Sequence, residues 1–147
     1  MYTKFMTLKS IIVNLLTVSF SSITLIHVYW FLGGEKGLDA ALPHDIEILK
    51  NKFSLPVIRL INAFLLAPVI LVFCMLILSL HDGFLLIAPY KKQIYFWFSI
   101  LFILRGVLGW LLLNKFTKKE IFIRNNTFIY SPISLVLGVL LMGLYLL

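Results

Sequence analysis

The chain has 147 residues, of which 61% are hydrophobic and only 13% are charged. Soluble domains carry about 25% charged residues, and the apolar excess here lies in long uninterrupted runs, which favours a membrane protein over a soluble one with a larger core. The net charge of +7 lies almost entirely between those runs. No stretch is therefore long enough to form the basic face of a nucleic-acid-binding domain, which excludes nucleic acid as a partner.

Four apolar runs are long enough to cross a membrane as helices. A helix needs ~20 apolar residues to span the ~30 Å hydrocarbon core. The pattern predicts an all-α, polytopic membrane protein in which residues 1–147 form a single domain, a bundle of four transmembrane helices with short loops. The predicted spans are about 10–32, 57–80, 93–114 and 128–147.

The first run follows Lys4 and Lys9, so a secretory signal peptide is an alternative interpretation. Signal peptides have apolar cores of only ~7–15 residues, followed by an Ala-x-Ala-like cleavage site that this run lacks. We therefore expect a permanent helix. Its last turns carry an imidazole, two amphipathic aromatic side chains and a glycine pair, which are His27, Tyr29, Trp30, Gly33 and Gly34.

Polar side chains also recur along one face of this first span. Within an arc of ~80°, at ~100° per residue, lie Asn14, Thr17, Ser21 and Thr24. Two interpretations are open. The stripe either forms hydrogen bonds between helices, worth about 0.6 kcal/mol each, or lines a polar cavity that leads to His27 and Arg105.

The connection 33–56 contains a polar piece, residues 44–50, whose apolar positions have the spacing of a short interfacial helix. Ser54 followed by Pro56 is typical of a helix start and opens the second span. Pro68 inside that span removes a backbone hydrogen bond, which predicts a bend.

The third span carries Arg105 in its interior, with Gly106 and Gly109 just after it. A charge at mid-membrane costs at least ~2.5–3.5 kcal/mol on insertion scales, so we expect Arg105 to face the bundle and the glycines to permit close packing. A basic loop and the polar residues 125–127 follow, and the last span opens with Tyr130, Ser131 and Pro132.

The basic residues predict an orientation. Eight Lys and Arg residues lie in or beside the loops 33–56 and 115–127, against four on the side of the two termini. The positive-inside rule places the more basic side in the cytoplasm. We therefore predict a multi-pass protein of the cell membrane with both termini outside and the loops 33–56 and 115–127 cytoplasmic.

The topology brings one set of polar and small side chains to the same half of the membrane, because the ends of spans one and three and the start of span four share a side. We expect a polar half-membrane pocket with the end of the first span as one wall and Arg105 as the other. The binding-site candidates are His27, Tyr29, Trp30, Gly33, Gly34, Arg105, Gly109, Tyr130 and Ser131.

The sequence gives little support for a metal or cofactor site. His81 lies on the opposite side of the membrane from His27 and His44, so the three histidines cannot form one site, and no ligand spacing supports a smaller one. Cys74 is the single cysteine, which excludes a disulfide within the chain and a cysteine-based zinc site. We predict no metal, no cofactor and no catalytic residue.

Three short motifs resemble a family of small bacterial membrane proteins catalogued as domain of unknown function 3995. They are His27-x-Tyr29-Trp30-x-x-Gly33-Gly34, Arg105 with Gly106 and Gly109, and Tyr130-Ser131-Pro132. The resemblance covers nearly the whole chain. It implies a four-helix integral membrane protein and brings no established activity or catalytic residues. The chain departs from the family pattern at Ile133-Ser134, where Leu-Cys is usual.

Three functional hypotheses follow from the residues. The preferred one is a non-enzymatic bundle that binds membrane lipid or a partner protein, since arginine pairs well with phosphate and carboxylate. The second is a membrane enzyme acting on a lipid or isoprenoid-like substrate, with His27 as acid or base and Arg105 as a clamp for phosphate or an oxyanion. The third is a transporter or channel subunit, which would require a homo-oligomer because four helices make a narrow bundle.

Overall fold

The structure is a computed structural model that describes residues 2–43, 54–81 and 86–147. No strand occurs among these residues, and the long helices confirm the all-α class predicted from the sequence. The long helices are α1 (Tyr2–Phe31), α4 (Leu55–Leu80), α5 (Lys91–Leu111) and α7 (Ser131–Leu146). The short elements are α2 (Leu38–Ala41), η1 (Ala88–Tyr90), η2 (Leu113–Lys115), α6 (Glu120–Asn125) and η3 (Asn126–Tyr130).

Four helical segments are long and apolar enough to cross a membrane, as expected of a multi-pass membrane protein. They are Leu8–Phe31, Ala63–Leu80, Ala88–Lys115 and Glu120–Leu146. The predicted interfacial helix at 44–50 lies outside the described residues. Helix α4 continues through Pro68.

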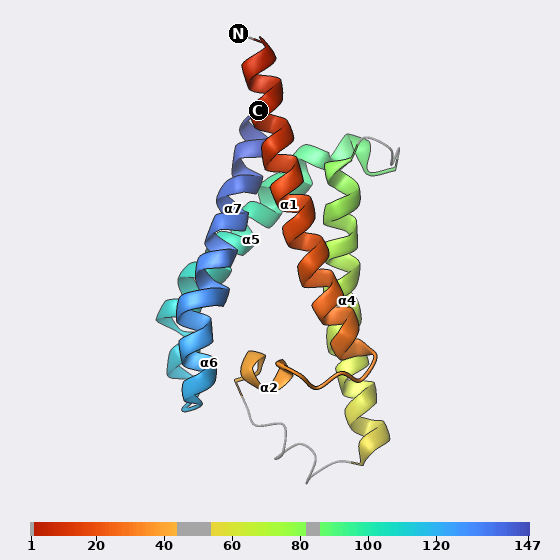
Figure 1. The fold of residues 1–147 in the computed structure, drawn as a ribbon, viewed down its shortest axis with the longest axis vertical. Helices are drawn as coiled ribbons and strands as arrows, with labels where there is room; N and C mark the ends of the chain where they lie inside the picture. Colours follow the sequence, from red (N-terminus) through yellow and green to blue (C-terminus); the bar gives the residue numbers. More distant parts are fainter. Residues whose placement is uncertain (1, 44–53, 82–85) are drawn as a thin grey trace.

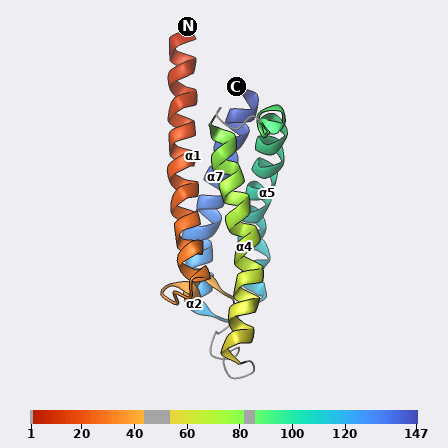
Figure 2. The same ribbon diagram turned by 90° about the vertical axis from the view of Figure 1, so that its right-hand side faces the viewer.

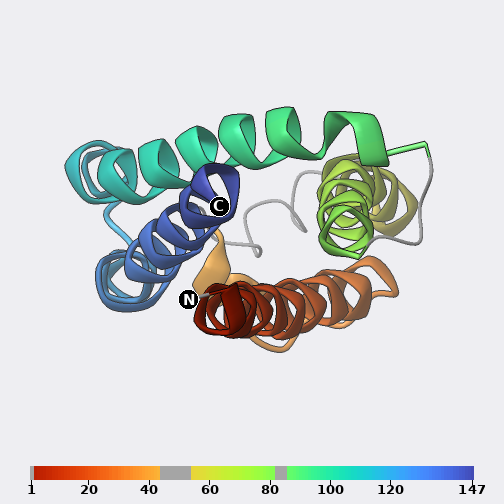
Figure 3. The same cartoon turned by 90° about the horizontal axis from the view of Figure 1, so that it is seen from above.

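The four long helices form two pairs, α1 with α4 and α5 with α7. The pairs meet near the two chain termini and diverge toward α2, which lies in the opening between them (Figure 1). All four helices run roughly along the long axis (Figure 2). Seen from above, α1 and α5 lie on opposite sides, and they spread apart toward their C-terminal ends (Figure 3).

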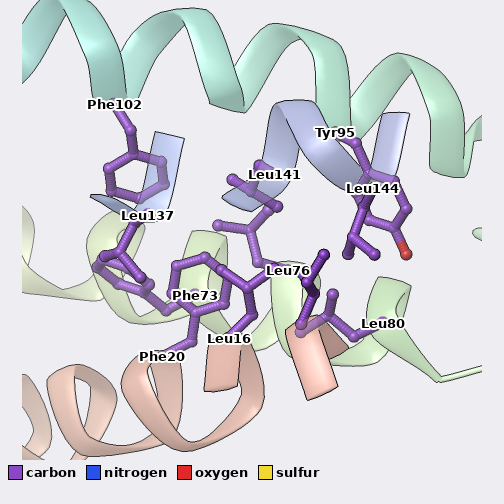
Figure 4. Close-up of a cluster of buried hydrophobic side chains, with 11 residues drawn as sticks. Leu16, Phe20, Phe73, Leu76, Leu80, Tyr95, Phe102, Leu137, Leu141 and Leu144 are labelled. Atoms are coloured by element: carbon purple, nitrogen blue, oxygen red, sulfur yellow. The ribbon is translucent and has the colours of Figure 1, made fainter. Parts of the chain in front are cut away.

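The hydrophobic core explains why the pairs meet at the end near the termini. Phe20 of α1 contacts Phe73 of α4 and Phe102 of α5, with ring centroids 5.6 and 5.8 Å apart. Leu137 lies beside Phe102 of this trio (Figure 4). The remaining core residues continue toward the chain termini, and they are Ile12, Leu16, Leu76, Leu80, Tyr95, Leu141 and Leu144. On the α2 side of the trio, the buried hydrophobic side chains of the described residues are Leu38 and Phe122.

Small residues bring α5 and α7 close together, as the sequence predicts. A Cβ atom on Gly106 would lie 2.5 Å from Cγ of Leu135, and one on Gly138 would lie 2.9 Å from the backbone oxygen of Ser99. Such distances leave no room for any side chain. Glycine at these positions therefore permits the tight packing of this pair.

The last membrane helix differs from the prediction. Residues 125–127 were expected in a loop, whereas α6, η3 and α7 follow one another without a break from Glu120 to Leu146. The segment η3 is π-helical. The loop prediction was wrong because a polar residue such as Asn126 beside a basic loop is typical of a solvent-exposed position. In the structure the side chain of Asn126 is fully buried, and protein groups are its hydrogen-bond partners.

The polar stripe of α1 makes hydrogen bonds within the protein. Oγ1 of Thr24 donates to the backbone oxygen of Phe20 at 2.7 Å. Oγ1 of Thr17 lies 3.4 Å from Nε2 of His81, at the end of α4. The Thr17 bond joins two helices and favours the helix-packing interpretation for that residue, whereas the Thr24 bond stays within α1.

Candidate functional site

The structure divides the nine candidate residues into two groups. The first group is at the C-terminal end of α1, which packs on α4, and the second is where α5 meets the start of the last helix. The helix pairs diverge toward this end (Figure 1). Among the described residues, His27 makes its contacts within its own helix pair and Arg105 makes its hydrogen bond within the other pair.

The glycine pair of the first group ends α1 in a Schellman motif. The backbone N–H of Gly34 donates to the oxygen of Tyr29 at 2.9 Å, and that of Gly33 donates to the oxygen of Trp30 at 3.0 Å. Gly33 has a φ of 98°, in the left-handed region that glycine adopts without strain. The glycines thus have a clear structural role in turning the chain.

Tyr29 and Trp30 hold the chain that follows the turn. The ring of Tyr29 covers Gly34 so closely that a Cβ atom there would overlap it. The hydroxyl of Tyr29 accepts a hydrogen bond from the N–H of Lys36 at 3.4 Å, and Nε1 of Trp30 donates to the backbone oxygen of Lys36 at 3.1 Å. Both side chains therefore fold residues 34–36 back onto the helix end.

His27 faces α4 in the first group. Its Nδ1 lies 2.8 Å from the backbone oxygen of Ile23, and because a carbonyl only accepts, Nδ1 carries the proton. Its ring packs 6.0 Å from Phe73 and 5.2 Å from Trp30. These contacts are with apolar rings and a backbone oxygen, and they orient the imidazole between α1 and α4.

The second group is organised around a side chain that the sequence did not single out, Asn126. Nη2 of Arg105 donates to Oδ1 of Asn126 at 3.1 Å. Nδ2 of Asn126 donates to the backbone oxygen of Gly109 at 2.6 Å and to Oδ1 of Asn114 at 2.9 Å. Asn126 thereby joins the two helices, and we refer to Arg105, Gly109, Asn126 and Ser131 as the arginine junction.

Gly109 and Ser131 make room for the guanidinium group. A Cβ atom on Gly109 would lie 2.5 Å from Nη1 of Arg105 and would also collide with Oγ of Ser131. Ser131 is fully buried, and its hydroxyl donates to Oδ1 of Asn126 at 3.4 Å. The missing side chain at Gly109 therefore creates the space that the arginine occupies.

One nitrogen of the junction has no hydrogen-bond partner. Nη1 of Arg105 is buried, and no protein group accepts a hydrogen bond from it. A buried donor without an acceptor is costly, and such groups in native structures call for an explanation. Among the described residues, no carboxylate forms an ion pair with Arg105. The junction thus carries an uncompensated positive charge within a membrane-spanning helix.

Further polar contacts continue from the junction toward the end of α5. Nδ2 of Asn114 donates to Oγ1 of Thr127 at 2.9 Å, and Nε1 of Trp110 donates to the backbone oxygen of Thr127 at 2.8 Å. The π-helical segment η3 starts at Asn126, and π-helical segments inside α-helices are frequent at functional sites. A series of hydrogen-bonded polar groups therefore extends from the buried arginine to the end of α5.

Tyr130 points away from the junction to α2. Its hydroxyl donates to the backbone oxygen of Ala40 at 3.4 Å, whereas its neighbour Ser131 lies in the junction. The described residues contain no group of three or more His, Cys, Asp and Glu side chains that could hold a metal ion. Arginine and amide groups, which suit anions rather than cations, define the chemistry of this site.

No curated protein and no solved structure matches the chain. Residues 20–141 match a family described as protein of unknown function (DUF3995). The match covers most of the chain and includes both groups of candidate residues. The end of α1 and the arginine junction thus lie within the family's own region, and the chain is a member of the DUF3995 family.

Proposed function

We propose that this protein is a non-enzymatic membrane module that binds an anionic group, a phosphate or carboxylate of a membrane lipid, at the arginine junction. The observation that carries the proposal is the buried Nη1 of Arg105, which has no protein acceptor. An anionic oxygen would accept a hydrogen bond from this nitrogen and compensate the charge at the same time.

The chemistry of arginine supports an anionic ligand. Its guanidinium group stays protonated in proteins and presents donors in a fixed fork that matches phosphate and carboxylate. The neutral Asn126 accepts one of these donors without neutralising the charge. An intramembrane arginine that faces protein is a functional candidate by default, because placing it there is costly.

The position of the junction supports a ligand that approaches from the loop side. Arg105 lies ten residues before Lys115, the last residue of η2, or about 15 Å of helix rise. Its side chain reaches Asn126, which is only six residues after Glu120, the first residue of α6, or about 9 Å. The side chain therefore climbs toward the basic segment 115–124, which attracts anionic headgroups.

Lipid binding by a matched pair of variants tests the proposal. Purified wild-type protein in nanodiscs should bind labelled phosphatidic acid more tightly than phosphatidylcholine. Arg105→Gln should lower the affinity for phosphatidic acid about tenfold or more, since hydrogen bonds to charged groups contribute about 1.5–3 kcal/mol. Lys92→Gln removes a positive charge from an exposed position in the first turn of α5, at the other end of that helix from the junction, and should leave the affinity nearly unchanged.

Two outcomes would contradict the proposal. Equal affinities of the wild type and Arg105→Gln for phosphatidic acid would show that the junction does not bind the lipid. An equal loss of affinity in Arg105→Gln and in the control variant would show the same. Inorganic phosphate serves as a competitor. We expect no displacement at millimolar concentration, and full displacement would identify a free anion rather than a lipid as the ligand.

The contacts of His27 favour binding over catalysis. An enzyme acting on a lipid would need an acid or base oriented toward the bound group. The imidazole is instead oriented by the backbone oxygen of Ile23 and by Phe73, and it belongs to the helix pair that diverges from the one carrying Arg105 (Figure 1).

A further inference from the structure

The segment 34–43, which includes α2, is attached to both helix pairs, and we refer to it as the strap. On the α1 side, Tyr29 and Trp30 hold the strap through the backbone of Lys36. Figure 1 shows that the strap then enters the opening between the pairs. Leu38 of α2 is buried there, with an exposed fraction of 7%.

Four polar contacts fix the strap to the other pair. Nζ of Lys119 donates to the backbone oxygen of Asp39 at 2.7 Å and forms an ion pair with its carboxylate. Oγ1 of Thr117 donates to the backbone oxygen of Pro43 at 2.5 Å. The hydroxyl of Tyr130 donates to the backbone oxygen of Ala40. The strap therefore links the two helix pairs at the end where they diverge.

The buried side chains of the hydrophobic core lie mostly toward the opposite end. Beyond Phe20 and Phe73 toward the strap, the core continues for one more turn with the half-buried Ile23 and Val69. Packed cores resist deformation, whereas elements joined by a few surface bonds can separate. The distance between the pairs on this side thus depends on the strap.

Arg105 lies on a face of α5 that meets both the other helix pair and the last membrane helix. Phe102 and Gly109 share this face with Arg105, since the three are spaced at intervals of three or four residues. Phe102 contacts rings of the other pair, and Gly109 lies against Ser131. The guanidinium group itself lies at the Gly109 end of this face, within the arginine junction.

Neighbouring residues connect the strap to the arginine junction. Tyr130 holds Ala40 of the strap, and Ser131, the next residue, donates to Asn126 within the junction. The ion pair itself is partly exposed, with exposed side-chain fractions of 12% for Lys119 and 57% for Asp39. Partly exposed pairs contribute modest stability, so the ion pair is the attachment of the strap that a single charge change can remove while Leu38 stays buried.

We propose that the strap is a gate, whose release from Lys119 lets the helix pairs separate and admits the anionic ligand to Arg105. This inference rests on the proposed function, because it concerns access to that same site. A gate changes how fast a ligand enters and leaves, and it changes the affinity much less.

Charge reversal at the ion pair tests the gate. Lys119→Glu and Asp39→Lys should each raise the association and dissociation rates of labelled phosphatidic acid about two- to fivefold, the range expected for losing an exposed pair. The double variant, which restores an ion pair of opposite polarity, should return both rates toward the wild type. Lys118→Glu makes the same charge change at an exposed neighbouring position and is the control.

A spin-label distance gives a second measurement that needs no ligand. Leu32 and Phe116 follow α1 and η2 and are 79% and 74% exposed, so labelled cysteines there fit without disturbing the core. In a Cys74→Ser background, the distance between the labels should lengthen and broaden in Lys119→Glu and recover in the double variant.

The outcomes separate the two proposals. Unchanged label distances in Lys119→Glu would overturn the gate, and so would unchanged association and dissociation rates of the lipid. Either result would leave the ligand site standing if Arg105→Gln still weakens binding. If Arg105→Gln binds the lipid as the wild type does while the label distances still lengthen in Lys119→Glu, the proposed ligand site is overturned. The strap would then only set the distance between the helix pairs.

Discussion

Nη2 of Arg105 donates a 3.1 Å hydrogen bond to Oδ1 of Asn126, the first residue of the π-helical segment η3. This bond joins the third and fourth membrane segments through a neutral acceptor and leaves Nη1 without a protein partner. The arginine is thus positioned by the protein but not neutralised by any described residue. This arrangement is the basis for the predictions that follow.

Replacing Gly109 by alanine should disrupt the junction. The new Cβ would lie 2.5 Å from Nη1 of Arg105, so the guanidinium group has to leave its position, while alanine is the better helix former. We expect weaker binding of phosphatidic acid with little change in the unfolding temperature in detergent. Gly143→Ala is the control, because its Cβ would meet only Ile12 at 3.8 Å. Equal effects of both variants would contradict this account of Gly109.

Asn126→Leu should destabilise the protein by about 1–3 kcal/mol, because it leaves Arg105, Asn114 and the backbone oxygen of Gly109 without their partner. Chemical denaturation in detergent measures this free energy of unfolding. Asn125→Leu, one position earlier and only half-buried, should change it far less. A stable Asn126→Leu variant with normal lipid binding would show that the junction does not depend on this amide.

Gly33→Ala should destabilise the end of α1. Gly33 has a φ of 98°, and forcing a residue with a Cβ atom into the left-handed region costs roughly 1–2 kcal/mol. Asparagine tolerates this region better, so Gly33→Asn should lose less stability than Gly33→Ala. Thermal unfolding of the two variants checks this order, and the reverse order would argue against a Schellman motif.

The orientation can be tested by labelling a single cysteine. In a Cys74→Ser background, Lys118→Cys places a thiol at an exposed position of the segment that follows η2. The excess of basic residues on this side predicts that it faces the cytoplasm. A membrane-impermeant maleimide should therefore label the cysteine only after cells are opened. Labelling in intact cells would show that the orientation is the opposite of the predicted one.

The sequence predicted the membrane helices well, because long apolar runs have few alternatives to spanning helices. It also singled out Arg105 and Gly109 as candidates, since a charge or a glycine inside such a run is conspicuous, and the two residues lie together in the arginine junction. Asn126 was missed because burial of a polar residue depends on partners far away in the sequence. The only local signal was its position directly before the last apolar run.

The grouping of the candidates could not be predicted for a similar reason. The topology places His27 and Arg105 in the same half of the membrane, but it does not determine how far apart the helices lie. That distance depends on packing, and the core side chains lie on the other side of the aromatic trio. The motif around Tyr29 and Trp30, which we predicted as part of a binding site, holds the following residues against the end of α1.

The most direct test of the account is an experimental structure of the protein purified with its native lipids, examined at Nη1 of Arg105. We predict a phosphate or carboxylate oxygen of a bound lipid within about 3 Å of this nitrogen. A protein backbone oxygen in that position, with no ligand near the guanidinium group, would contradict the account.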